Sequence, residues 1–116
     1  MERRYRAIIQ LGESVPEKHE RALRNARTLL EELGSDTEVE LLFHNQAVEL
    51  LTVGRLDRAE EMRQLHERGV CIAACGRALE GLGLTRDALL DFVHVVPTST
   101  TELVKRQAEG WAYIKM

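Results

Sequence analysis

Aromatic residues are scarce in this chain and make up 4% of its 116 residues. A hydrophobic core must therefore be built mainly from Leu, Val, Ile and Ala side chains. The composition is 44% hydrophobic and 30% charged, which is enough apolar material for a core and enough charge for solubility. A length of this order is typical of a single domain, and we expect one domain over residues 1–116.

Long apolar runs are also missing. No stretch approaches the roughly 20 apolar residues that a membrane-spanning helix needs. The basic residues near Met1 are not followed by the apolar segment of a signal peptide. The net charge of −3 gives no general attraction to nucleic acid or to an anionic membrane. We therefore expect a cytoplasmic protein that binds neither.

Cysteine is rare, with two residues at positions 71 and 75. If both lie in one strand, their Cα atoms are about 13 Å apart at the usual rise per residue. A disulfide requires Cα atoms within roughly 7 Å. Cys71 and Cys75 should therefore be free thiols, as is usual in a reducing cytosol.

Short apolar runs alternate with segments of helical spacing along the whole chain. Strands are predicted at 4–11, 38–43, 70–74, 93–96 and 111–115. Helices are predicted at 17–34, 46–51, 57–68, 77–82 and 101–109, with a further short helix capped by Thr85. Strict alternation with short connections favours parallel pairing. We expect an α/β fold, a three-layer α/β/α sandwich around an open, mainly parallel five-stranded sheet.

The first helix has the clearest pattern, with one apolar face and a glycine, Gly34, at its end. Ser14 and Glu17 have the spacing of a capping box around Pro16 in the first turn. The mixed Arg and Glu residues of 17–27 and 58–68 are typical of solvated ion-pair surfaces.

Cys75 is the strongest candidate for chemistry. It follows the apolar strand 70–74 and precedes a helix, and ligands gather at such strand ends in parallel sheets. A helix N-terminus favours the thiolate, which is the reactive form of cysteine. Free N–H groups beside Gly76 would also stabilise an anion. The alternative is that Cys75 is simply a small buried hydrophobe, as we expect for Cys71.

His44 and Asn45 end the second strand, on the same edge of a parallel sheet as Cys75. His44 is a candidate proton donor or ligand, or else a polar loop residue. Asn45 is a candidate for a turn or cap. The other histidines are assigned to solvated helix faces or to a structural position, namely His19, His66 and His94.

Metal and nucleotide sites have weak support. Cys75, His44 and His94 could together hold a metal, but no two ligands have the close spacing of zinc sites. No G-x-G-x-x-G pattern follows the first strand, and spacing alone does not support a Ser–His–Asp triad. We expect neither a metal nor a cofactor.

Several segments, in this order and spacing, resemble one known family. They are Ala74-Cys75-Gly76 at a strand end, Leu23-Arg24-Asn25-Ala26 in the first helix, and a closing run from Val95-Val96-Pro97 through Glu102-Leu103-Val104 to Gln107–Ile114. The chain resembles the DsrE/DsrF-like family, which includes TusD and YchN-like sulfur-relay proteins.

The resemblance implies a parallel sandwich that assembles into trimers or hexamers. It also implies that a cysteine at the position of Cys75 carries sulfur as a persulfide between a donor and an acceptor protein, without a cofactor. Many relatives have Asn-Thr where this chain has Arg77-Ala78. We expect the N–H groups of Gly76 and Arg77, and the Arg77 charge, to stabilise the anion, with His44 as a nearby polar group.

A second reading is a non-catalytic oligomeric module that binds a small ligand or partner, with Cys75 incidental. The apolar residues of 111–116 fit either an ordinary covered strand or a contact between subunits.

Overall fold

The structure is a computed structural model that describes residues 5–55 and 57–116. Its centre is a five-stranded sheet in the order β4-β3-β2-β1-β5, and every neighbouring pair is parallel. The predicted parallel α/β fold is therefore confirmed. The strands are β1 (Tyr5–Leu11), β2 (Thr37–Phe43), β3 (Cys71–Cys75), β4 (His94–Val96) and β5 (Ala112–Lys115).

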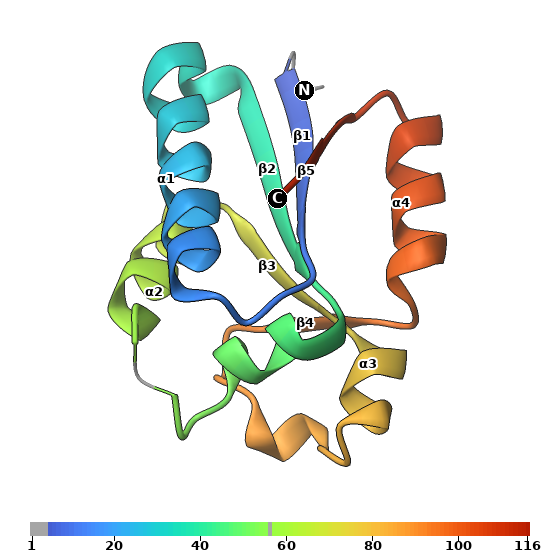
Figure 1. The fold of residues 1–116 in the computed structure, drawn as a ribbon. Coiled ribbons are helices and arrows are strands. Elements are labelled where there is room, and N and C mark those ends of the chain that lie inside the picture. The colour runs from blue at the N-terminus through green and yellow to red at the C-terminus, as the bar shows by residue number, and fades with distance from the viewer. Residues whose placement is uncertain (1–4, 56) are drawn as a thin grey trace.

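Helices cover both faces of the sheet. In Figure 1, α1 (Pro16–Leu33) and α2 (Ala59–Glu67) lie on one face and α4 (Ser99–Ala108) lies on the other. The short α3 (Gly76–Gly81) lies near the carboxyl ends of the strands, with the 3₁₀ helix η2 (Asn45–Leu51). Two further 3₁₀ turns are η1 (Gly34–Asp36) and η3 (Arg86–Ala88). The predicted helix at 46–51 is thus a 3₁₀ helix.

The start of α1 differs from the prediction. Val15 is the N-cap residue and makes no side-chain capping hydrogen bond, so the capping box expected at Ser14 is wrong. Pro16 takes the first helical position, where its missing N–H costs nothing. The end is as predicted, because Gly34 has a φ of 80°, a conformation that glycine adopts without strain.

His19 is buried, whereas a solvated face was predicted. Its side chain is 2% exposed and meets the Phe43 ring edge-on, with centroids 5.8 Å apart. Residues three and four further along, Ala22 and Leu23, are also buried, so His19 belongs to the core face of α1. Burial, assisted by the charge of Arg58, lowers the pKa of His19 to about 4.

The second face of the sheet has a smaller apolar cluster and a buried charge cluster. Glu40 of β2 is fully buried there. Arg106 of α4 donates from Nε to Glu40 Oε1 at 2.9 Å and to Glu102 Oε2 at 3.2 Å. Its guanidinium stacks 4.5 Å above the centre of the Trp111 ring. Arg106 therefore fastens α4 to the sheet.

The contacts of the Glu40 carboxyl group in this cluster do not fully offset the cost of burying it. Its Oε2 atom is buried and has no hydrogen-bond partner among the described residues. Burial, together with the neighbouring Glu102, raises the pKa of Glu40 to about 8, although Arg106 acts in the opposite direction. Three carboxyl groups, those of Glu40, Glu102 and Glu109, share the Arg106 guanidinium, and burial of Glu40 favours its protonated form near neutral pH.

Ion pairs within the start of α2 and between α1 and α2 agree with the predicted solvated charge surfaces. Arg58 pairs with Glu20 and with Glu61, each at 2.8 Å, and Arg27 reaches Glu61 at 2.8 Å. Within the described part of the chain, no helix is long and apolar enough to cross a membrane.

Candidate functional site: a pocket at the end of β3

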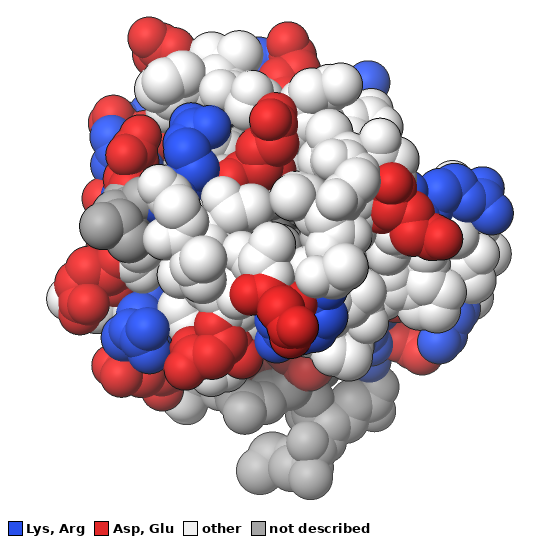
Figure 2. Space-filling view, turned by 90° about the horizontal axis from the view of Figure 1, so that it is seen from below, with Lys and Arg blue, Asp and Glu red and all other residues white. Residues whose placement is uncertain are grey.

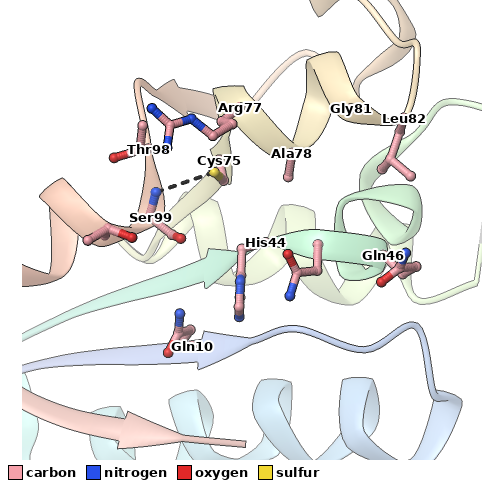
Figure 3. Close-up of a pocket in the computed structure, with 12 residues that line it drawn as sticks. Gln10, His44, Gln46, Cys75, Arg77, Ala78, Gly81, Leu82, Thr98 and Ser99 are labelled. Carbon is pink, nitrogen blue, oxygen red and sulfur yellow. Dashed lines mark hydrogen bonds between the residues drawn. The ribbon is translucent and has the colours of Figure 1, made fainter.

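A pocket of about 520 Å³ opens at the carboxyl edge of the sheet, where parallel folds place their sites. It lies among the ends of β1, β2 and β3, the helix α3 and the first turn of α4 (Figure 3). The lining residues come from these segments and from the start of η2, and are Gln10, His44, Asn45, Gln46, Cys75, Arg77, Ala78, Gly81, Leu82, Thr98, Ser99 and Thr100.

Cys75 is the last residue of β3 and is 5% exposed. Its Sγ lines the pocket and accepts a hydrogen bond from the backbone N–H of Ser99, at 3.3 Å (Figure 3). Ser99 is the first residue of α4, and Thr98 caps that helix by accepting from the N–H of Thr101 at 3.1 Å. The sulfur therefore meets a free N–H at the positive end of a ten-residue helix.

The predicted donors to the sulfur were Gly76 and Arg77, and this prediction is wrong. The backbone N–H of Arg77 donates instead to the Pro97 carbonyl at 3.3 Å. Among the described residues, the only hydrogen bond to Cys75 Sγ comes from Ser99. The helix that points at the sulfur is thus α4, rather than α3, which follows Cys75 in the chain.

Gly76 has a different role, which is to permit close packing. A Cβ atom added there would lie 3.0 Å from the Val96 carbonyl and 3.2 Å from the Pro97 carbonyl. The absence of a side chain lets the end of β3 approach the turn between β4 and α4. This close approach is what brings Cys75 to Ser99.

Arg77 contributes its side chain to the pocket wall. Within residues 5–55 and 57–116, no carboxylate forms an ion pair with its guanidinium. Its charge is therefore available to a ligand or to an anion on Cys75.

His44 and Asn45 lie at the same pocket, as the edge argument predicted. His44 packs against Gly12 so closely that a Cβ atom there would be 2.6 Å from the imidazole Nε2. Burial, and to a lesser degree the charge of Lys115, lowers the pKa of His44. Asn45 has a φ of 50°, a left-handed conformation that Asn tolerates well, so its identity also serves the backbone.

Gln10 was not predicted. Its side chain is 8% exposed, and its Oε1 accepts a hydrogen bond from the Tyr113 hydroxyl of β5. No described residue accepts a hydrogen bond from Gln10 Nε2, which lies at the pocket (Figure 3). The signal for Gln10 was its position near the end of a strand, at the same edge as Cys75.

The metal site considered for Cys75, His44 and His94 does not form. His94 begins β4, is exposed, and pairs in register with Ala73, so it lies away from the pocket edge. Among the described residues, no group of three His, Cys, Asp or Glu side chains could hold a metal ion.

Cys71 begins β3 and is half-buried rather than in the core as predicted. Burial, and next the nearby Glu40, raises the pKa of Cys71 to about 12. Both cysteines are free thiols, as their spacing predicted. They are chemically unequal, because only Cys75 has a backbone donor at its sulfur among the described residues.

A sequence model of the DsrE/DsrF-like family matches residues 7–116. The chain belongs to the DsrE/DsrF-like family. The predicted resemblance is thereby confirmed, and it spans nearly the whole sequence. No curated protein matches the chain.

Solved structures of similar shape include other small proteins. A protein of unknown function from Methanobacterium thermoautotrophicum is 29% identical, with a TM-score of 0.91 over 97% of this chain and 99% of that one. The YchN protein of Escherichia coli has a TM-score of 0.82 at 19% identity, over 97% and 99%. A conserved protein of unknown function from Bacteroides thetaiotaomicron has a TM-score of 0.76 at 13% identity, over 100% and 98%. The last two likenesses concern the fold alone.

Proposed function

We propose that this DsrE/DsrF-like protein is a sulfur carrier in which Cys75 accepts sulfane sulfur as a persulfide and passes it to a partner thiol. The observation that supports this role is the hydrogen bond from the Ser99 N–H to Cys75 Sγ at the wall of an open pocket. A thiolate or a persulfide anion at this position gains both that donor and the field of α4.

The chemistry consists of two displacements. The Cys75 thiolate attacks the outer sulfur of a donor persulfide, a new S–S bond forms, and the donor leaves as a thiolate that takes up the proton. An acceptor thiolate then attacks the terminal sulfur and releases Cys75 as a thiolate. Each step exchanges one S–S bond for another, so no external oxidant, reductant or cofactor is needed.

Two neighbours in the pocket have supporting roles in this proposal. The guanidinium of Arg77, which has no ion-pair partner among the described residues, adds positive charge beside the anionic sulfur. His44, neutral at pH 7 because burial lowers its pKa, is a polar neighbour in the same pocket, with its imidazole directed toward Gly12. Asn45 adopts the backbone turn next to His44. Gly76 permits the close approach of β3 to the start of α4.

The direct test is mass spectrometry after incubation with a sulfane-sulfur donor. We expect an adduct of about 32 Da, one added sulfur, on Cys75. The Cys75→Ser variant should lose the adduct, and the Cys71→Ser variant should keep it. An adduct retained at the wild-type level by Cys75→Ser would disprove the proposal.

A non-catalytic binding module is the second candidate, and the 5% exposure of Cys75 favours it. In that case the pocket holds a ligand, and the thiol reacts no faster than a buried, unassisted cysteine. Alkylation of Cys75 faster than that of Cys71 at pH 7 favours the sulfur carrier, whereas equal and slow rates favour the module.

We also propose assembly into a trimer or hexamer, in a reducing, cytoplasmic setting with separate sulfur donor and acceptor proteins. Support for assembly comes from the face of the sheet that only α4 covers among the described helices (Figure 1). There, Val104 is 64% exposed and Tyr113 is 41% exposed. Light scattering tests this, and a monomer at micromolar concentration would contradict it.

A further inference from the structure

The pocket lining has an unusual charge balance for this protein. The chain carries 19 acidic and 16 basic residues, yet none of the described residues that line the pocket is Asp or Glu. One lining residue, Arg77, is cationic. Figure 2 shows that charges of both signs are mixed over this end of the molecule, with uncharged side chains between them. The described part of the pocket lining is therefore free of carboxylates, although the protein as a whole is acidic.

Two hydrogen-bond donors at this pocket lack partners among the described residues. One is the Arg77 guanidinium, and the other is the Nε2 group of Gln10. Gln10 is 8% exposed as a residue, but its Nε2 is not among the buried side-chain atoms that lack a partner, so this amide group is open to the pocket. Both donors are therefore available to a ligand oxygen that enters the pocket.

The orientation of Gln10 is fixed by a contact from a different strand. Tyr113 of β5 donates its hydroxyl hydrogen to Gln10 Oε1, which leaves the amide nitrogen toward Cys75 (Figure 3). Because β1 and β5 pair in register at Ile8 and Tyr113, the sheet itself places this hydroxyl. The pocket thus presents a fixed donor rather than an adaptable one.

We propose that the pocket admits a small anion to Cys75, with Arg77 and Gln10 Nε2 holding its negative oxygens. A pocket of about 520 Å³ has the size of a small-molecule site. Besides a protein donor, the pocket therefore takes a low-molecular-weight sulfur compound with a carboxylate or another oxyanion, and neutral compounds of equal size are disfavoured. Sulfur transfer as the reaction at Cys75 rests on the proposed function. The preference of the pocket for an anion over a neutral compound does not.

The test uses two alkylating reagents that differ in charge, iodoacetate and iodoacetamide. The full chain with Cys71→Ser has Cys75 as its single thiol, and the ratio of the two rate constants is compared with that of free cysteine in the same buffer. We expect the iodoacetate-to-iodoacetamide ratio to exceed that of free cysteine by at least about threefold, with the excess falling as salt screens the attraction.

Two variants in the pocket and one control variant test which residues cause the preference for the anionic reagent. Arg77→Ala and Gln10→Leu should each bring the ratio toward that of free cysteine, whereas Arg21→Ala, on an exposed position of α1, should not. A ratio at or below that of free cysteine, a ratio unchanged in both pocket variants, or no reaction with either reagent overturns the proposal. Circular dichroism confirms that each variant is folded before its rates are compared.

The outcome is separable from that of the sulfur-carrier proposal. A charge preference without a persulfide adduct would leave the anion pocket in place and remove sulfur transfer. A persulfide adduct on Cys75 without any charge preference would leave sulfur transfer in place and remove the anion pocket.

Discussion

Cys75 Sγ and the backbone nitrogen of Ser99 lie 3.3 Å apart, at the end of β3 and the start of α4. Parallel pairing of Cys75 with Val96 makes this possible, because the chain leaves β4 beside the end of β3 and enters α4 within a few residues. The environment of the thiol is therefore set by the turn after β4, and substitutions in that turn should change Cys75 reactivity.

Replacing Ser99 by proline should slow the reaction of Cys75 and leave the fold intact. Proline lacks the N–H that meets the sulfur but fits the first position of a helix. Thr98 is extended, with φ −148° and ψ 151°, as the residue before a proline prefers. We expect the alkylation rate of Cys75 at pH 7 to fall by roughly three- to tenfold, from the loss of about 1 kcal/mol of anion stabilisation.

Ser99→Ala is the matched control, because it removes the hydroxyl and keeps the N–H. Its alkylation rate should stay close to that of the wild type. Equal rates in Ser99→Pro and the wild type would show that this N–H does not stabilise the thiolate.

Cys71 should be inert despite its greater exposure. Its pKa of about 12 leaves almost no thiolate at pH 8. In a Cys75→Ser variant, we expect iodoacetamide to leave Cys71 largely unmodified at pH 8 and to react clearly only above about pH 10. Peptide mapping gives the extent of labelling, and rapid labelling at pH 8 would contradict the assignment.

Glu40 should make the folded protein less stable as the pH rises. Its pKa is near 8 in the folded state against 4.5 ordinarily, so its favourable contribution is complete below about pH 4.5 and is lost by about pH 8. Glu40→Gln keeps an acceptor for Arg106 and cannot ionise. We expect the stability advantage of the variant to grow from pH 5 to pH 8, by about 1 kcal/mol or more in all.

Urea unfolding at several pH values measures this difference. Glu109→Gln, which changes an exposed carboxyl that also contacts Arg106, is the control and should show a much smaller dependence. A constant difference between Glu40→Gln and the wild type would show that Glu40 is ionised throughout.

His19 should make the folded protein more stable as the pH rises, because its imidazole is buried in the neutral form. Its pKa is about 4 in the fold against 6.5 ordinarily, so its stabilising contribution is present above about pH 6.5 and is lost as the pH falls to 4. His19→Leu should abolish this acid loss. Between pH 4.5 and 6.5 the His19 and Glu40 contributions oppose each other, so the wild type should vary less with pH than either variant.

Thermal unfolding between pH 4 and 7 tests the His19 contribution. His66→Leu on the exposed part of α2 is the control and should resemble the wild type. An acid loss in His19→Leu equal to that of the wild type would contradict the assignment.

Much of the fold could be predicted from local pattern. Alternating apolar strands and helices, with Gly34 ending α1, indicated the parallel sheet and its two covering layers. Parallel pairing puts the carboxyl ends of the strands at one edge of the sheet. The prediction therefore placed His44, Asn45 and Cys75 together at that edge. The core position of His19 could have been predicted as well, because it lies three and four residues before Ala22 and Leu23.

The hydrogen bond to the sulfur was not predictable in the same way. Local sequence suggested the nearest N–H groups, at Gly76 and Arg77, but the donor comes from Ser99. Which helix reaches a strand end depends on strand order and on the close approach at Gly76, and both are tertiary properties. The Gln10–Tyr113 contact is similar, because it requires that β5 pair with β1.

The strand order also constrains how the chain folds during synthesis. β1 lies between β2 and β5, so one of its edges stays open while all the intervening elements are made. Until β5 emerges, a nascent chain exposes a strand edge that could pair with another copy. Exposed Lys115 and half-buried Ile114 close that edge last, so shortening the chain before β5 is expected to promote aggregation on the ribosome as well as to remove the Tyr113 hydroxyl.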